Sequence, residues 1–366
     1  MNKSYYSLGL MSGTSGDGID ASIIQSDGDN EYKVILDQYF KYNENIYSNI
    51  HNLKDKINNL KDLKDFDQEI QPIEKEITLF HSKVVNEISS KFDSNIDFIG
   101  FHGQTIYHNE KEKVSKQLGN GKLLSQLTKK TVIYNFRQND LINGGNGAPL
   151  SPIFHKIMVN QNKIKLPVTI LNLGGVANVT NLKIENNTSM LFALDVGPGN
   201  CLIDSWIRKN SKENYDLNGS LAKSGKIQKD ILKVGLNRYF AKQQSENKLT
   251  YDIKDFDLSF VNGLSLEDGA ATLTEFTAEI LSKYLYNIKN IVVCGGGRKN
   301  LFLLESIKKR INHNLLPIEN YNIDGDFVES QAFAFLAIRS YLKLPISFPT
   351  TTGVNKPCSG GEIINN

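Results

Sequence analysis

The chain has few cysteines, no long apolar run and almost no net charge, and each of these absences excludes a class of protein. Its three cysteines, Cys201, Cys294 and Cys358, lie far apart and form no C-x-x-C pair, which argues against a disulfide scaffold or a cysteine zinc site. No apolar run approaches the ~20 residues of a membrane helix, and the N-terminal apolar run is too short for a signal peptide. Lysine and arginine number 42 against 40 acidic residues, and the net charge of +2 favours neither nucleic acid nor a membrane surface as a partner. We therefore expect a cytoplasmic protein.

The length of 366 residues is large for one hydrophobic core and predicts two domains. The stretches LGLMSGTSGDGIDASII and TILNLGGVANVTNLKI are each typical of two strands joined by a glycine turn. Helical patterns follow both, so we expect two related α/β domains that face each other across a cleft. The expected strands are 5–10, 19–25, 32–39, 98–101, 131–135, 168–173, 176–182, 189–195 and 290–294, and the expected helices lie within 44–91 and at 121–128, 201–209, 266–287, 300–310 and 332–338. A glycine- and proline-rich loop from Gln138 is the expected domain boundary.

The first glycine turn, residues 12–18, has the composition of a phosphate-binding loop. It contains three glycines, three hydroxyl side chains and one carboxylate. Glycine lets backbone N–H groups approach an anion, and hydroxyls add further donors to phosphate oxygens. Asp17 or Asp20 would suit Mg²⁺, which usually takes one or two carboxylates together with phosphate oxygens and water. An ordinary polar hairpin is the alternative interpretation.

A second set of candidates lies in the middle of the chain. Asp195 is placed at the end of an apolar strand and before a glycine loop, where a carboxylate can act as a general base. The alternative is that Asn200 caps the following helix and Asp195 only braces the loop. Taken alone, the turn at 174–175 is an ordinary tight turn, whereas paired with the first hairpin it would be the second jaw of a phosphate clamp. The glycines at 295–297 offer bare backbone to an adenine or ribose.

A polar patch suited to a sugar is predicted from five further residues. His102 and Gln104 are expected at the end of a strand, and Arg137, Asp140 and Glu329 would complete the patch with hydrogen bonds to hydroxyl groups. The alternative for His102 is a packed, hydrogen-bonded residue of the core.

The motifs GLMSGTSGDGID, IGFHGQT, FRQND, GGNGAPLSP, LNLGGVANVT, LDVGPGN, CGGGRKN and TTTGV, in this order, resemble those of anhydro-N-acetylmuramic acid kinases. The resemblance spans nearly the whole chain. It implies two duplicated actin-like (ribonuclease H-like) ATPase domains around a central cleft. The first would comprise residues 1–137 and 345–366, and the second residues 138–344.

The resemblance also implies the reaction. ATP and Mg²⁺ would be the cofactors, and 1,6-anhydro-N-acetylmuramic acid would be hydrolysed and phosphorylated to N-acetylmuramic acid 6-phosphate in cell-wall (peptidoglycan) sugar recycling. Asp195 would be the catalytic base, and Asp17 would bind the metal directly or through water. The implied nucleotide site comprises Gly13, Thr14, Ser15, Gly16, Asp17, Gly18, Ile19, Asp20, Gly174, Gly175, Gly197, Gly199, Gly295, Gly296, Gly297 and Asn300, and the implied sugar site comprises His102, Gln104, Arg137, Asp140 and Glu329.

Two departures and two alternatives accompany this resemblance. Gly16 stands where family members commonly carry Leu or Met, and Arg298 and Lys299 replace small or neutral residues. One alternative is a kinase for another 1,6-anhydrosugar, such as levoglucosan. The other is an ATP-binding actin-like regulator without turnover, against which the presence of Asp195 argues. A homodimer is compatible with the sequence, which does not determine the oligomeric state.

Overall fold

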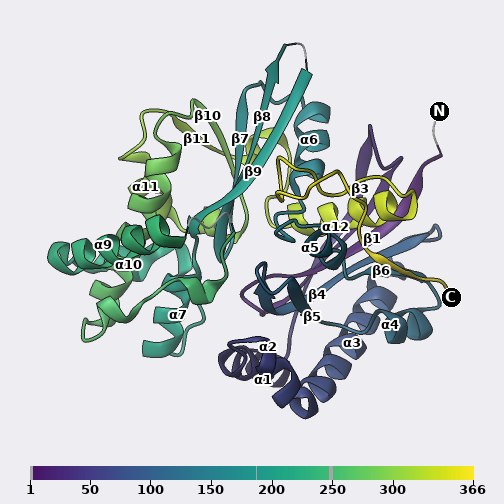
Figure 1. The fold of residues 1–366 in the computed structure, drawn as a ribbon, viewed down its shortest axis with the longest axis horizontal. Coiled ribbons are helices and arrows are strands. Elements are labelled where there is room, and N and C mark those ends of the chain that lie inside the picture. The colour runs from purple at the N-terminus through teal and green to yellow at the C-terminus, as the bar shows by residue number, and fades with distance from the viewer. Residues whose placement is uncertain (1–2, 187, 247–249) are drawn as a thin grey trace. The chain divides into compact units, whose positions relative to one another are not determined.

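The chain forms two compact units in a computed structural model that describes residues 3–186, 188–246 and 250–366 (Figure 1). Unit 1 comprises Met1–Lys163 and Asp326–Asn366, and unit 2 comprises Ile164–Gly325. These boundaries differ from the expected ones after residues 137 and 344. The glycine- and proline-rich loop contains a helix and leads into another within unit 1, and the helix at 328–341 packs on the sheet of unit 1.

Unit 1 is built on a seven-stranded sheet in the order β12-β6-β4-β1-β2-β3, with β5 paired to β4. The first three strands form an antiparallel meander, whereas β1, β4 and β6 run parallel. The strands are β1 (Tyr5–Ser12), β2 (Gly18–Ser26), β3 (Tyr32–Lys41), β4 (Phe98–Asn109), β5 (Val114–Leu118), β6 (Thr131–Tyr134) and β12 (Glu362–Ile364).

The helices of unit 1 supply the apolar side chains that bury both faces of this sheet. One core cluster joins the sheet to α1, α3 and α4, and a second joins it to α12. In Figure 1, α1, α2, α3 and α4 follow one another along one side of the unit. The helices are α1 (Glu44–Lys56), α2 (Leu60–Asp65), α3 (Asp67–Ser89), α4 (Gly121–Thr128), α5 (Gln138–Ile142), α6 (Pro152–Gln161) and α12 (Val328–Tyr341).

Helix α12 lies directly on the backbone of the two central strands. Gly9 and Gly100 are neighbours in the β1–β4 register. A Cβ atom at Gly9 would lie 1.9 Å from the carbonyl oxygen of Ser330, and one at Gly100 would lie 2.2 Å from that of Phe333. Because no side chain fits there, the glycine pair sets the close approach of α12 to the sheet.

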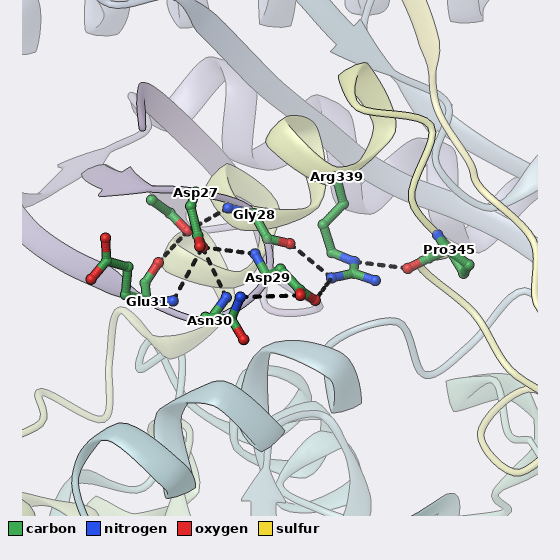
Figure 2. A network of polar contacts seen from close by, with 8 residues as sticks. Asp27, Gly28, Asp29, Asn30, Glu31, Arg339 and Pro345 are labelled. Carbon is green, nitrogen blue, oxygen red and sulfur yellow. Dashed lines mark hydrogen bonds and ion pairs between the residues drawn. The ribbon is translucent and has the colours of Figure 1, made fainter. Parts of the chain in front are cut away.

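A buried arginine ties the end of α12 to the turn between β2 and β3 (Figure 2). The Arg339 guanidinium donates to the carbonyl oxygens of Gly28 at 2.7 Å and Pro345 at 2.8 Å. Asp27 holds the same turn, because its Oδ1 accepts the N–H groups of residues 29, 30 and 31. Burial alone would raise the pKa of Asp27, but these hydrogen bonds outweigh it and lower the pKa. The network positions α12, which carries one of the predicted site residues.

Unit 2 is built on a five-stranded sheet in the order β11-β10-β7-β8-β9. Strands β7, β8 and β9 form an antiparallel meander, and β7, β10 and β11 run parallel. The strands are β7 (Val168–Leu173), β8 (Val176–Glu185), β9 (Thr188–Pro198), β10 (Asn290–Cys294) and β11 (Asn314–Pro317).

Helix α10 is central to unit 2, since it contributes to two apolar clusters there. One cluster joins the sheet to α10 and α11, and the other joins α10 to α7 and the segments that follow it. The α-helices are α7 (Cys201–Asn210), α8 (Ser220–Ser224), α9 (Lys229–Glu246), α10 (Leu266–Leu285) and α11 (Leu301–Lys308), and the 3₁₀ helices are η1 (Leu217–Gly219), η2 (Ile253–Asp255), η3 (Ser259–Val261), η4 (Gly296–Lys299) and η5 (Ile318–Tyr321).

The two units share one topology. The order β3-β2-β1-β4-β6 in unit 1 corresponds strand for strand to β9-β8-β7-β10-β11 in unit 2, with the same antiparallel and parallel pairs. This is the strand order of a ribonuclease H-like domain. It confirms the expected α/β class and the expected duplication. Among the described residues, no helix is long and apolar enough to cross a membrane.

The strands that carry His102, Gln104 and Asp195 extend further than the sequence predicts. Strand β4 runs to Asn109 because it pairs with β5, so His102 and Gln104 lie within the strand and not at its end. Strand β9 continues past Asp195 to Pro198, because its last residues pair with the start of β8. The prediction that these residues end their strands was therefore wrong.

Two buried histidines of unit 1 make its stability depend on pH. Burial lowers the pKa of His81 and of His155 from the ordinary 6.5 to about 4. Between pH 6.5 and 4 the unfolded chain therefore binds more protons than the folded chain, and stability falls as the pH drops. We expect each histidine to cost roughly 3 kcal/mol over this range.

Urea unfolding at pH 7, 6, 5 and 4 measures this loss. His81 packs against the rings of Tyr42 and Phe101, so His81→Phe keeps an aromatic ring in place while removing the proton site. We expect the variant to lose less stability than the native chain between pH 6.5 and 4. Equal losses in the two proteins would contradict the assignment to His81.

Candidate active site

The tip of the first hairpin, residues 13–17, is a compact turn between β1 and β2. The N–H of Gly16 donates to the Gly13 carbonyl at 3.1 Å. Gly16 has a φ of +63°, a conformation that suits glycine and disfavours larger residues. A Cβ atom at Gly13, by contrast, would meet no atom within 4 Å. The backbone at Gly13 is therefore open to close approach.

Side chains of α1 bind the carbonyl groups of this tip. The Nζ of Lys54 donates to the Thr14 carbonyl at 3.0 Å, and His51 Nε2 lies 2.9 Å from the Ser15 carbonyl. A carbonyl oxygen can only accept, so Nε2 of His51 carries the proton. The carbonyl oxygens of Thr14 and Ser15, which carry partial negative charge, therefore point towards α1.

The predicted metal and nucleotide residues in the tip and at the start of β2 have different environments. Asp17 is half-buried, and its carboxylate accepts a hydrogen bond from Ser15. Asp20 is also half-buried and lies on β2, opposite Met11 of β1. Ile19 is fully buried in the apolar core of unit 1, so its side chain contributes to the core. Among the described residues there is no cluster of three or more metal-ligating side chains.

The structure brings three of the predicted sugar residues together. Arg137 donates to His102 Nε2 from Nη2 at 2.9 Å and to the Gly147 carbonyl from Nη1 at 2.8 Å. The N–H of Gly147 in turn donates to Asp140 at 2.7 Å. His102, Arg137 and Asp140 therefore form one connected cluster around the backbone of Gly147.

The tautomer of His102 follows from its partners. Arginine can only donate, so Nε2 of His102 accepts and the proton lies on Nδ1, which donates to the Gly103 carbonyl at 2.8 Å. Burial, together with the charge of Arg137, holds the pKa of His102 well below 6.5. His102 is thus a neutral residue that orients Arg137. The structure gives it hydrogen bonds of the kind that the packed-residue alternative expects.

Thr352 is a residue of this cluster that sequence reasoning missed. Its hydroxyl donates to Asp140 Oδ1 at 2.6 Å, and its carbonyl accepts the N–H of Asn146 at 2.8 Å. Thr352 is fully buried. The TTTGV motif was noted only as a match of letters, and its 212-residue separation from Asp140 hid its role.

The other two predicted sugar residues, Glu329 and Gln104, differ in their surroundings. Glu329 is in the first turn of α12, one turn before Phe333, whose ring lies 4.5 Å from that of His102. The helix therefore places Glu329 on the side that faces the cluster. Gln104 instead bonds to the hairpin tip, at Ser12 and Gly13.

In unit 2, Asp195 lies on β9 beside a β-bulge. Ala177 pairs with Gly197 and Asn178 pairs with Asp195, so Val196 is the extra residue. A bulge re-aims the neighbouring side chains and is common next to active sites. Asp195 is 8% exposed, and its Oδ2 accepts the N–H of Tyr251 at 2.9 Å. This hydrogen bond orients the carboxylate.

Three glycine segments of unit 2 meet at one edge of its sheet. The N–H of Gly199 donates to Gly175 and that of Asn200 donates to Gly174, each at 2.9 Å. A Cβ atom at Gly199 would lie 2.1 Å from the Gly174 carbonyl, and one at Gly295 would lie 2.3 Å from the Asn172 side chain. Only glycine permits this close packing. The 174–175, 197–199 and 295–297 segments therefore lie together.

A polar row crosses the sheet at the same edge. Asn172 on β7 pairs with Asn178 on β8, which pairs with Asp195 on β9, so the three side chains share one face. The neighbouring row of paired residues on the same face is apolar apart from one threonine. It consists of Val292, Ile170, Thr180 and Ala193. Asn172 and Asn178 were not predicted as site residues. Both lie close to the glycine turn at 174–175 in the sequence, and this spacing could have indicated them.

Asn300 and Arg298 make their contacts within the loops of unit 2. Asn300 caps α11, since its side chain accepts the N–H of Leu303 at 3.0 Å. Asn200 is the N-cap residue before α7, but its side chain makes no capping hydrogen bond, which argues against the capping alternative. Arg298 donates to the Gly295 carbonyl at 3.1 Å and pairs with Glu319 at 2.6 Å. Arg298 thus braces the 295–297 loop.

Two sheets of one strand order, each with a glycine turn in its first hairpin, are typical of the actin-like and hexokinase-like phosphotransferases. The model of the family described as "Anhydro-N-acetylmuramic acid kinase" matches residues 5–366, and the chain belongs to this family. The chain is therefore a kinase.

Relatives with this name cover almost the whole chain. The anhydro-N-acetylmuramic acid kinase of Pelagibacter ubique is 54% identical over 376 residues, with 100% of each chain covered. That of Zymomonas mobilis is 36% identical over 97% of this chain and 98% of its own. Among solved structures, the activator of the 2-hydroxyisocaproyl-CoA dehydratase from Clostridium difficile is 14% identical, with a TM-score of 0.44, over 91% of this chain and 94% of its own.

Proposed function

We propose that the chain uses ATP to open the 1,6-anhydro ring of 1,6-anhydro-N-acetylmuramic acid and to phosphorylate the freed O6. The products are N-acetylmuramic acid 6-phosphate and ADP. The observation that carries this proposal is the position of Asp195, an oriented and largely buried carboxylate at the edge where three glycine segments meet. A nucleotide-binding protein without turnover has no need of such a base.

Asp195 acts on water in this proposal. It removes a proton from a water molecule as the water oxygen forms a bond to the anomeric carbon. The bond from that carbon to O6 breaks, and the electron pair stays on O6. The proton remains on Asp195 until the product leaves. Attack from the face opposite the bridge makes this an inverting cleavage.

The freed O6 then attacks the γ-phosphorus in line, and the bond to the β,γ-bridging oxygen breaks to release ADP. The backbone at residues 13–17 and the glycine segments of unit 2 are the groups suited to stabilise the phosphate charge. Arg137, Asp140 and Glu329 offer the charged and polar groups that a sugar requires.

Magnesium fits the residues at the hairpin tip. Asp17 presents a half-buried carboxylate there, and the absence of a larger acidic cluster among the described residues agrees with an ion held mainly by phosphate and water. Asp17 would hold Mg²⁺ directly or through water. The ion supplies charge neutralisation on the transferring phosphoryl group.

ADP release with a panel of sugars tests the proposal. The panel contains 1,6-anhydro-N-acetylmuramic acid, levoglucosan and N-acetylmuramic acid, each with ATP and Mg²⁺. We expect the highest kcat/KM with the first sugar. A higher kcat/KM with levoglucosan would assign the chain to another anhydrosugar, and ATP binding without ADP release from any sugar would favour the regulator.

A further inference from the structure

Gln104 uses its side-chain amide on the hairpin tip. Its Oε1 lies 2.7 Å from the Ser12 hydroxyl, which donates to it, and its Nε2 donates to the Gly13 carbonyl at 3.0 Å. The carbonyl of Gly13 can only accept, so the orientation of the amide is determined. Gln104 is 1% exposed and Ser12 is 1% exposed. One glutamine of β4 thus binds both a side chain and the backbone of the tip.

A third strand contributes to the same buried network. The Tyr42 hydroxyl, just after β3, donates to Ser12 Oγ at 3.2 Å, and the N–H of Tyr42 donates to the Asp17 carbonyl at 2.9 Å. Ser12 Oγ also lies 2.9 Å from the Gly18 carbonyl. Buried polar networks whose members are satisfied rigidify the segments that they join. The ends of the 13–17 tip are therefore held from β4 and from the end of β3.

A bulge in β4 separates Gln104 from the sugar cluster. Leu10 pairs with Phe101 and Met11 pairs with Gly103, so His102 is the extra residue. Gly103 has a φ of +74°, which a β-branched or bulky residue could not adopt without strain. The bulge directs His102 to Arg137 and Gln104 to the hairpin tip.

We infer that Gln104 is a positioning residue for the phosphate loop at residues 13–17 and does not bind the sugar. With Tyr42 it holds the backbone of Gly13 in the orientation that receives the nucleotide phosphates. The HGQ segment of β4 therefore acts on two ligands. His102 acts on the sugar by orienting Arg137, and Gln104 acts on the nucleotide by positioning the loop. This inference rests on the proposed function, because it takes the ligand of the tip to be ATP.

Binding of a non-hydrolysable ATP analogue, measured by calorimetry, tests this together with the KM for the anhydrosugar at saturating ATP. Gln104→Leu removes both hydrogen bonds that the side-chain amide makes with Ser12 and Gly13. We expect it to raise the Kd for the analogue about tenfold, since each 1.4 kcal/mol is a factor of ten. The sugar KM should stay within twofold of the native value.

Gln161→Leu is the matched control. Gln161 also makes two amide hydrogen bonds to a strand, with the N–H and carbonyl of Tyr32, at the other end of β3 from Tyr42. Both ligand constants should be unchanged in this variant. Tyr42→Phe removes one bond of the network from a different strand and should raise the Kd for the analogue by a smaller factor.

A raised sugar KM with an unchanged Kd for the analogue would overturn the inference and make Gln104 a sugar ligand. If Gln104→Leu does not fold, an unchanged Kd in Tyr42→Phe overturns it. Equal losses of nucleotide affinity in the Gln161 control and the Gln104 variant would also overturn it. If the native chain does not bind the analogue, the proposed function itself is wrong. This outcome differs from failure of the inference about Gln104, in which the native chain still binds the analogue.

Discussion

Asp195→Asn is expected to lower kcat by ~10²–10⁴-fold, because general-base catalysis contributes about that factor. Asparagine has nearly the same shape, and its side-chain oxygen can still accept the N–H of Tyr251. It cannot take a proton from water. The Kd for ATP and the unfolding temperature should therefore stay near their native values. Steady-state ADP release and calorimetry on the same preparation measure both expectations.

Asp27→Asn is the control for this substitution. Asp27 is also a buried carboxylate that accepts backbone N–H groups, but it belongs to the turn between β2 and β3 (Figure 2). We expect Asp27→Asn to reduce stability and to leave kcat within threefold of the native value. A kcat within threefold of native in Asp195→Asn would remove Asp195 from the mechanism.

Gly13→Val should weaken ATP binding by ~10–10²-fold. A charge-assisted hydrogen bond from a backbone N–H to phosphate is worth roughly 1.5–3 kcal/mol, and a branched side chain at Gly13 would keep the phosphate away. The protein itself leaves space at this position, since a Cβ atom there meets nothing within 4 Å. Calorimetry with ATP measures the effect separately from folding.

The unfolding temperature and the affinity for the anhydrosugar serve as internal controls for Gly13→Val. Both should be unchanged, because the substitution touches neither the core nor the His102 cluster. An ATP affinity equal to that of the native chain would show that the phosphate does not approach Gly13. A lost sugar affinity would instead indicate a wider change in unit 1.

The hairpins and glycine segments could be predicted because their signals are local. Alternating apolar residues around a glycine turn determine β1–β2 and β7–β8, and the strand ends of a parallel sheet bring glycine loops to one edge. Helix α9 was not predicted. It has a glycine, Gly235, in its interior and no regular apolar face.

The partners of the site residues could not be predicted, because they depend on pairings between distant segments. Gln104 forms a hydrogen bond with Ser12, which lies 92 residues away in the sequence. The bulge at His102, which directs the two side chains to different partners, has no signature in the amino-acid composition. The N–H that orients Asp195 belongs to Tyr251, 56 residues further on. Sequence reasoning identified the chemical groups and assigned Gln104 to the sugar, whereas the structure bonds it to the hairpin tip.

Isotope tracing tests the central claim most directly, because ring opening by water distinguishes this reaction from that of an ordinary sugar kinase. The reaction is run in ¹⁸O-water and stopped early, with unlabelled product incubated in parallel to correct for exchange. The account predicts label at the anomeric oxygen, none in the phosphate ester oxygen, and the α-anomer as the first product, since water attacks opposite the bridge. Label in the ester oxygen, or an initial β-anomer, would contradict the account and leave Asp195 without its task.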